Sequence, residues 1–237
     1  MASARDRLIV ALDVPSTAEA QGIVTALGES VSIYKVGKQL FTAAGPGVVR
    51  ELIGSGRKVF LDLKFHDIPS TVASAVQAAS ELGVSMLTVH ASGGSRMLKA
   101  AVEAASTAKR PPKVLAVTVL TSFSDADLKE VGVAGPAQGQ VLRLASLAQK
   151  SGCGGVVASA REAKVIRRVL GASLTIVTPG VRPAGGPKDD QARVATPSEA
   201  IAAGADYVVV GRPITGAKDP VAAARAILEE ISPKVLA

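Results

Sequence analysis

Short runs of aliphatic and β-branched residues alternate along the chain with longer, Ala-rich stretches in which apolar residues recur at helical spacing. The short runs predict eight strands, at residues 8–12, 33–36, 58–63, 86–90, 114–119, 155–158, 174–178 and 207–210. The stretches between them predict helices that include residues 17–27, 70–82, 94–108, 140–150, 162–169, 197–203 and 220–231. Eight strand-and-helix repeats predict an α/β fold in which parallel strands close into a single (β/α)8 TIM barrel.

The segments that connect these elements indicate that residues 1–237 form a single barrel domain. Gly83, Gly152 and Gly204 each follow a predicted helix, where a left-handed residue closes the last turn. No linker or low-complexity segment divides the chain. Residues 184–190, rich in Gly, Pro and Asp, form the one long polar loop after a predicted strand, and we expect this loop to be a lid.

The composition limits the class of protein. Aromatic residues make up only 3% of the chain and Trp is absent, so the core must be built mainly from Ala, Val, Leu and Ile. Cys153 is the single cysteine and cannot form an intramolecular disulfide. The apolar run near the N-terminus is too short for a signal peptide, and no run is long enough to span a membrane. We therefore expect a soluble cytoplasmic protein with no membrane partner.

The chain is basic, with a formal net charge of +7. Its Lys and Arg residues are scattered rather than clustered, and aromatic residues for base stacking are scarce. This argues against a nucleic-acid partner. The charge fits a small phosphorylated substrate or a solvated basic surface.

Charged residues gather where the second and third predicted strands end, which is the mouth of a barrel and the usual place for its active site. Asp62 and Lys64 lie two residues apart on one strand, so both side chains face the mouth while Leu63 faces the helices. Asp67 follows in the next loop, and Lys35 on the neighbouring strand can reach Asp62. The alternative reading is an ion-pair network that only ties the two strands together.

An alternating Lys-Asp-Lys-Asp array has a chemical consequence. Neighbouring carboxylates keep Lys64 protonated, because they favour its charged form against desolvation. A fixed ammonium group can stabilise and protonate a carbon that becomes negative. The array therefore suits a reaction that forms a carbanion, although it does not name the substrate.

Residues 178–182 and 210–215 follow the seventh and eighth strands, whose loops bind phosphate in many barrels. Gly211 allows a close backbone approach, Arg212 offers two parallel donors, and Gln191 can close over the same anion. The alternative is a tight turn with Arg212 in solvent. His66 and His90 are interpreted as structural hydrogen-bonding groups, and no metal-ligand spacing appears in the sequence.

The stretch from Asp62 to Thr71, DLKFHDIPST, closely resembles the signature of the orotidine 5'-phosphate decarboxylase family. The resemblance extends through residues 11–13, 34–37, 117–122, 178–182, 190–191 and 210–215. It covers nearly the whole chain and implies a cofactor-free, metal-free enzyme of UMP synthesis that converts orotidine 5'-phosphate to UMP. Ser70 departs from the Asn that is frequent in the family, which bears on helix capping more than on chemistry.

The resemblance also implies a role for each matched residue. Lys35, Asp62, Lys64 and Asp67 would be catalytic, with Asp62 beside the substrate carboxylate and Lys64 protonating the C6 carbanion. Asp67, Ile68 and Thr71 would be donated by the second subunit of a homodimer with shared active sites. The remaining substrate contacts would be Asp13 and Lys35 at the ribose, Thr121 at the pyrimidine, Gln191, Gly211 and Arg212 at the phosphate, and Pro179 and Arg182 near the phosphate loop.

Two alternatives remain open. A Mg²⁺-dependent sugar-phosphate decarboxylase or aldolase of the same superfamily shares the Asp-x-Lys pattern but needs further carboxylates for its metal. A nucleotide-binding regulator without turnover would bind UMP and release no CO2.

Overall fold

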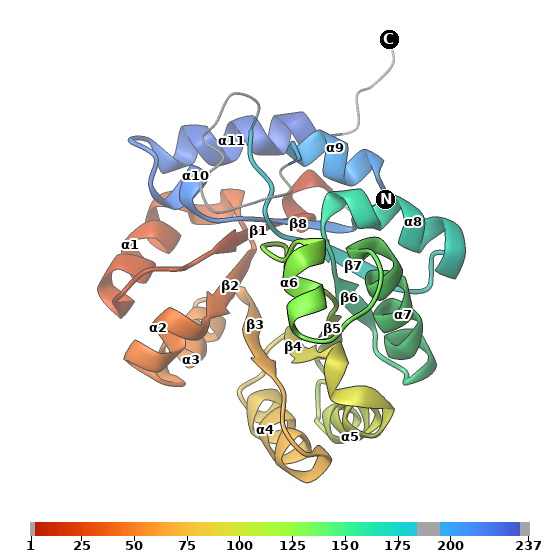
Figure 1. Cartoon of the computed structure of the whole chain (residues 1–237). Helices are drawn as coiled ribbons and strands as arrows, with labels where there is room; N and C mark the ends of the chain where they lie inside the picture. Colours follow the sequence, from red (N-terminus) through yellow and green to blue (C-terminus); the bar gives the residue numbers. More distant parts are fainter. Residues whose placement is uncertain (1–2, 184–194, 233–237) are drawn as a thin grey trace.

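A computed structural model describes residues 3–183 and 195–232 as a closed barrel of eight parallel strands surrounded by helices (Figure 1). The strands follow one another around the barrel in chain order, and β8 pairs with β1. This confirms the predicted (β/α)8 fold. The strands are β1 (Leu8–Ala11), β2 (Ile33–Gly37), β3 (Lys58–Phe65), β4 (Met86–His90), β5 (Lys113–Val117), β6 (Gly155–Val157), β7 (Thr175–Thr178) and β8 (Tyr207–Val210).

All seven predicted helices are present, with boundaries shifted by a few residues at most. They are α1 (Thr17–Leu27), α4 (Pro69–Glu81), α5 (Gly94–Ser106), α7 (Ala137–Lys150), α8 (Ala160–Leu170), α9 (Pro197–Ala202) and α11 (Pro220–Ile231). Gly83, Gly152 and Gly204 have positive φ just beyond α4, α7 and α9, as predicted. The expected lid at residues 184–190 lies outside the described residues.

Several short helices were not predicted. These are α2 (Lys38–Ala44), α3 (Gly47–Gly54), α6 (Asp125–Glu130), α10 (Arg212–Thr215) and the 3-10 turns η1 (Ala4–Asp6), η2 (Gly28–Ser30) and η3 (Ala91–Gly93). Each is too short for an apolar repeat to develop over several turns. Gly45, with φ +64°, and Pro46 separate α2 from α3, so the two helices do not form one longer pattern.

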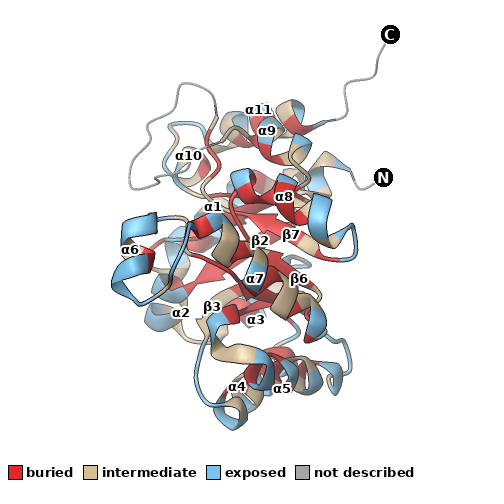
Figure 2. Ribbon diagram, turned by 45° about the vertical axis from the view of Figure 1, so that its right-hand side comes forward, coloured by how far each residue is buried: buried red, intermediate tan, exposed pale blue. Residues whose placement is uncertain are grey.

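The core has two parts, and they follow the alternation of side chains along the strands. Leu8 and Val10 of β1 point outward and pack under the helices, whereas Ile9 points into the barrel. The inner cluster comprises Ile9, Ala11, Ile33, Phe60, Met86, Leu115, Val177 and Val209. Figure 2 shows the buried strands enclosed by helices whose outer faces are exposed. Aliphatic side chains thus fill the core on both sides of the sheet, as expected for a chain with few aromatic residues. Among the described residues, no helix has the length and apolar character needed to cross a membrane.

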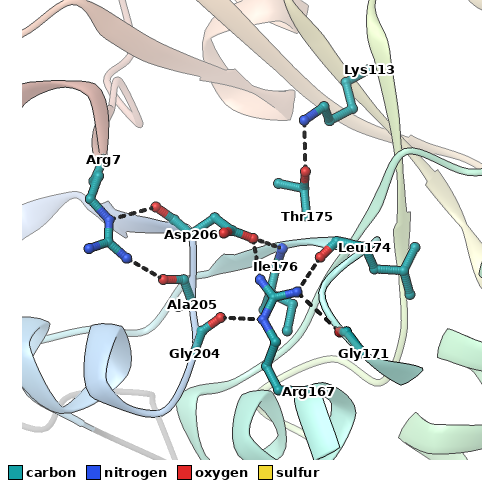
Figure 3. Close-up of polar contacts among 10 residues, drawn as sticks. All are labelled: Arg7, Lys113, Arg167, Gly171, Leu174, Thr175, Ile176, Gly204, Ala205 and Asp206. Carbon is teal, nitrogen blue, oxygen red and sulfur yellow. Dashed lines mark hydrogen bonds and ion pairs between the residues drawn. The ribbon is translucent and has the colours of Figure 1, made fainter. Parts of the chain in front are cut away.

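Polar side chains fasten the strands at the barrel end opposite the mouth (Figure 3). Arg167 of α8 donates to the carbonyl oxygens of Gly204 at 2.9 Å and Leu174 at 2.6 Å, and it pairs with Asp206. Asp206 in turn accepts the backbone N–H of Ile176 at 2.7 Å. Arg167 therefore joins α8 to the segments that enter β7 and β8.

Two histidines stack where β3 and β4 end. The rings of His66 and His90 lie 5.2 Å apart between centroids and 16° from parallel. His90 Nδ1 is 2.6 Å from the Ser92 hydroxyl and accepts the Ser92 N–H at 3.4 Å. Burial, followed by the positive charge of His66, Lys64 and Lys38, lowers the pKa of His90 to about 4. His90 is thus hydrogen-bonded, as interpreted from the sequence, and its structural role stays a prediction.

We expect Arg167→Ala to destabilise the protein by about 2 kcal/mol, because it leaves two partly buried carbonyl groups without their donor and breaks the ion pair with Asp206. Arg168→Ala is the matched control, since Arg168 is the next residue of α8 and is exposed. Chemical denaturation of both variants measures the effect. Equal stability of the two would contradict the proposed fastening role.

We expect the free energy of unfolding to fall less steeply with decreasing pH in a His90→Gln variant than in the wild-type protein. Between pH 4 and pH 6.5 the unfolded chain binds a proton at His90 that the folded chain does not, so this residue makes folding less favourable as the pH falls through that window. The wild-type protein should lose about 2 kcal/mol more than the variant across the window. Urea denaturation at several pH values tests this, and parallel curves for the two proteins would refute it.

Candidate active site

Two adjoining cavities open at the carboxyl ends of the strands. The larger has a volume of about 400 Å³ and the smaller about 150 Å³, and Lys35, Pro179 and Val209 line both. The other residues of the larger cavity are Ala11, Asp13, Gln39, Gly180, Arg182, Gly211, Arg212 and Thr215. The other residues of the smaller cavity are Phe60, Asp62, Lys64, Val117, Val119, Leu120, Thr121 and Val157, with Val177.

Asp62 and Lys64 form a close ion pair on β3, at the wall of the smaller cavity. The Lys64 ammonium nitrogen lies 2.9 Å from each carboxylate oxygen of Asp62. Both side chains are largely shielded, with 14% of Asp62 and 27% of Lys64 exposed. Leu63 between them packs against the outer core, as predicted. A charged hydrogen bond in a shielded site is stronger than one in water, so this pair fixes the ammonium group at the cavity wall.

The backbone of β3 departs from the regular strand that the sequence predicts. The pairing with β4 shifts register between Leu61 and Phe65, and Lys64 has φ +53°. No other non-glycine residue among those described has positive φ. A left-handed conformation is strained for a residue with a Cβ atom, and such strain concentrates at functional sites.

Lys35 on β2 joins this pair to Asp13 on the loop after β1. Its ammonium nitrogen is 2.8 Å from Asp13 Oδ1 and 3.8 Å from Asp62 Oδ2, and the whole residue is only 8% exposed. Gly37 makes room for this arrangement, because a Cβ atom there would lie 2.8 Å from Asp13 Oδ1 and 2.9 Å from Lys35 Nζ. Within one chain, four side chains of alternating charge therefore form a row in the order Asp13, Lys35, Asp62, Lys64.

Asp67 is not part of this order within one chain. It is exposed, its carboxylate accepts the N–H of Ile68 at 2.6 Å, and no ion pair is recorded for it among the described residues. Ile68 and Thr71 are also exposed, and neither lines the two cavities. Within one chain, the predicted Lys-Asp-Lys-Asp array is therefore present only as far as Lys64, and Asp67 does not join it.

The remaining predicted residues divide between the cavities. Thr121 lines the smaller one, and Pro179, Arg182, Gly211 and Arg212 line the larger one. Gln191 lies outside the described residues. The sequence did not single out Gln39, which lines the larger cavity from the short helix α2, where periodicity gives no signal. Thr215 of α10 also lines this cavity and lies within the predicted phosphate-binding segment 210–215, although it was not predicted as a contact itself.

The two cavities differ in chemical character. The larger one combines Lys35, Arg182 and Arg212 with a glycine that permits close backbone approach, so it suits an anion. The smaller one is walled mostly by valines and Phe60, with the Asp62–Lys64 pair at its edge, so it suits a flat, largely apolar ring beside a fixed positive charge. Among residues 3–183 and 195–232, no three His, Cys, Asp or Glu side chains form a cluster suited to a metal ion.

Known proteins match the chain over nearly its whole length. The sequence profile described as "Orotidine 5'-phosphate decarboxylase / HUMPS family" matches residues 6–227. An orotidine 5'-phosphate decarboxylase of Halorhodospira halophila is 56% identical over 226 residues, which is 95% of this chain and 96% of the relative. The corresponding protein of Nitrosococcus oceani is 51% identical over 228 residues, covering 96% of this chain and 98% of the relative.

A solved structure has the same architecture. The crystal structure of orotidine 5'-phosphate decarboxylase from Lactobacillus acidophilus has a TM-score of 0.86 at 43% sequence identity, and the match covers 96% of this chain and 100% of that one. Fold and sequence thus agree, and the chain belongs to the orotidine 5'-phosphate decarboxylase / HUMPS family.

Proposed function

We propose that this protein decarboxylates orotidine 5'-phosphate to UMP and CO2 in de novo pyrimidine biosynthesis. The observation that carries the proposal is the Lys64 ammonium group, held by both oxygens of Asp62 at the wall of an apolar cavity that adjoins a cationic one. A nucleotide matches this division, with its ring in the smaller cavity and its phosphate in the larger. The family match and the identity of the relatives support the same substrate.

The proposed reaction places negative charge on a carbon atom. The bond between C6 and the carboxylate breaks, CO2 leaves, and the electron pair stays at C6 in the plane of the ring, where no π system absorbs it. The fixed charge of Lys64 stabilises this pair, and one ammonium proton then moves to C6 to give UMP. Solvent returns a proton to the lysine. Asp62 lies beside the leaving carboxylate in this arrangement.

Binding energy away from C6 orients the ring. Gly211 and Arg212, together with Gln191, hold the phosphate, with Pro179 and Arg182 near it. Asp13 and Lys35 hold the ribose hydroxyl groups, and Thr121 contacts the pyrimidine. Contacts to the phosphate can lower the barrier at C6 when they order the charged groups around the reacting atoms.

The proposed catalyst is a homodimer with shared active sites. Asp67, Ile68 and Thr71 lie together at the start of α4 and are exposed, and Ile68 is an apolar side chain with 63% of its surface exposed. An exposed aliphatic residue beside a carboxylate suits contact with a second copy. Asp67 from that copy would complete the array beyond Lys64.

We propose that the reaction needs no metal or organic cofactor. The Lys64 ammonium group contacts both oxygens of Asp62. It therefore occupies the position that a metal ion bound by this carboxylate would need. A Mg²⁺-dependent sugar-phosphate enzyme of the superfamily would need that carboxylate for its metal.

We expect the purified, EDTA-treated protein to convert orotidine 5'-phosphate to UMP, followed as a loss of ultraviolet absorbance and as released CO2. Lys64→Ala should lower kcat by at least about a thousandfold, because it removes both the charge and the proton donor. Lys58→Ala is the matched control, since Lys58 is an exposed lysine at the other end of β3. Activity lost with EDTA and restored by Mg²⁺ would favour the metal-dependent alternative. Tight UMP binding without CO2 release would favour a regulator.

Mixing two inactive variants tests the shared site. Asp67→Ala and Lys64→Ala chains should regain about a quarter of wild-type activity when exchanged in equal amounts, because half of the dimers contain one intact site. A mixture of Asp62→Ala and Lys64→Ala should stay inactive, since both residues belong to the same chain's cluster. No recovery in the first mixture, despite demonstrated subunit exchange, would contradict the shared site.

A further inference from the structure

Thr88 is a fully buried polar residue on β4, directly beside the irregular part of β3. It is 0% exposed, and it lies two residues beyond Met86, which belongs to the inner core of the barrel. Its side chain therefore points into the barrel. Polar groups at such positions are destabilising unless they are hydrogen-bonded.

In the pairing of β3 with β4, Thr88 lies opposite a bulge in β3. Leu61 pairs with Leu87 and Phe65 pairs with Val89, so residues 62–64 of β3 stand against Thr88 alone. A bulge of this kind takes backbone groups out of the ladder. The Lys64 N–H is one of these groups, and it needs another acceptor.

The Thr88 hydroxyl supplies that acceptor and also reaches the carboxylate. Its oxygen accepts the Lys64 N–H at 2.8 Å, and its proton is donated to Asp62 Oδ1 at 3.0 Å. A hydroxyl group can do both, because it has one proton to donate and lone pairs to accept. Thr88 thus contacts the backbone of one member of the ion pair and the side chain of the other.

We propose that Thr88 is a positioning residue for the reaction, an inference that rests on the proposed function. Its hydroxyl holds Lys64 at φ +53° and orients Asp62 so that both carboxylate oxygens lie 2.9 Å from the Lys64 ammonium nitrogen. Without the hydroxyl, the strained backbone relaxes and the carboxylate rotates. The ammonium group then loses its fixed direction toward the cavity.

A positioning role differs from a merely structural one in what it changes. Misplacing a reacting group by about 1 Å can lower the rate about a hundredfold while ground-state binding stays intact. A loss of packing alone changes stability and leaves both kcat and the direction of the Lys64 ammonium group as they were.

Thr88→Val tests the proposal, because valine keeps the shape of threonine and lacks the hydroxyl. We expect kcat to fall by about 10- to 100-fold, with the Kd for UMP within about twofold of wild type. Thr88→Ser keeps the hydroxyl and should stay within about threefold of wild type, and Thr88→Ala serves the same comparison if the valine variant does not fold.

Thr118→Val is the matched control. Thr118 is 1% exposed and its hydroxyl donates to the Val157 carbonyl oxygen at 2.9 Å, so the variant loses a buried hydrogen bond without touching the ion pair. We expect this variant to keep wild-type kcat. A wild-type kcat in Thr88→Val, or equal losses in the valine and serine variants at position 88, would overturn the proposal.

A measurement without substrate separates this proposal from the proposed function. Crystal structures of the substrate-free wild-type protein and variants show the Lys64 backbone and the Asp62 carboxylate directly. Thr88→Val should move Lys64 away from φ +53° and break the contact of its ammonium nitrogen with both oxygens of Asp62, and Thr118→Val should change neither. Unchanged positions of Lys64 and Asp62 in Thr88→Val would reject the positioning role even if the protein does not act on orotidine 5'-phosphate, whereas inactivity of the wild-type protein alone would reject only the proposed function.

Discussion

The contact between Lys64 and Asp62 is the interaction on which the rest of the site depends. Two opposite charges at the wall of an apolar barrel are destabilising unless they are paired and hydrogen-bonded. Here each carboxylate oxygen is 2.9 Å from the ammonium nitrogen, and the shielding of both side chains keeps water from competing for them. The pairing fixes one positive charge in direction as well as in position.

The neighbouring charges extend this pair in one direction only. Lys35 lies between Asp13 and Asp62 and is almost fully buried, so it is balanced on both sides. Lys64 is the end of the run in one chain and the more exposed of the two lysines. A positive charge that is paired with a single carboxylate can still attract a negatively charged ligand. The order of the four residues therefore distinguishes Lys35, whose charge is balanced by two carboxylates, from Lys64, whose charge is balanced by one.

The sequence predicts the frame of this site better than its details. Apolar periodicity identified all eight strands, and the rule that barrel sites lie at strand ends selected Asp13, Lys35, Asp62 and Lys64. A short helix such as α2 has too few turns for a repeat, so Gln39 was missed. Spacing along the chain placed Asp67 beside Lys64, whereas within one chain it lies apart and exposed, because spacing does not reveal where a loop points.

The bulge in β3 is the clearest limit of sequence reasoning, since it arises from the register between two strands. A regular strand also puts Asp62 and Lys64 on the same face, so the alternation rule gave the correct face with an incorrect backbone. Strain at Lys64 persists only if the surrounding structure holds it. The hydroxyl of Thr88 makes such a contact directly, because it accepts the Lys64 N–H at 2.8 Å. The hydrogen bonds of Arg167 lie at the opposite end of the strands, so the fastening of the approaches to β7 and β8 is spatially separate from the strained charge pair.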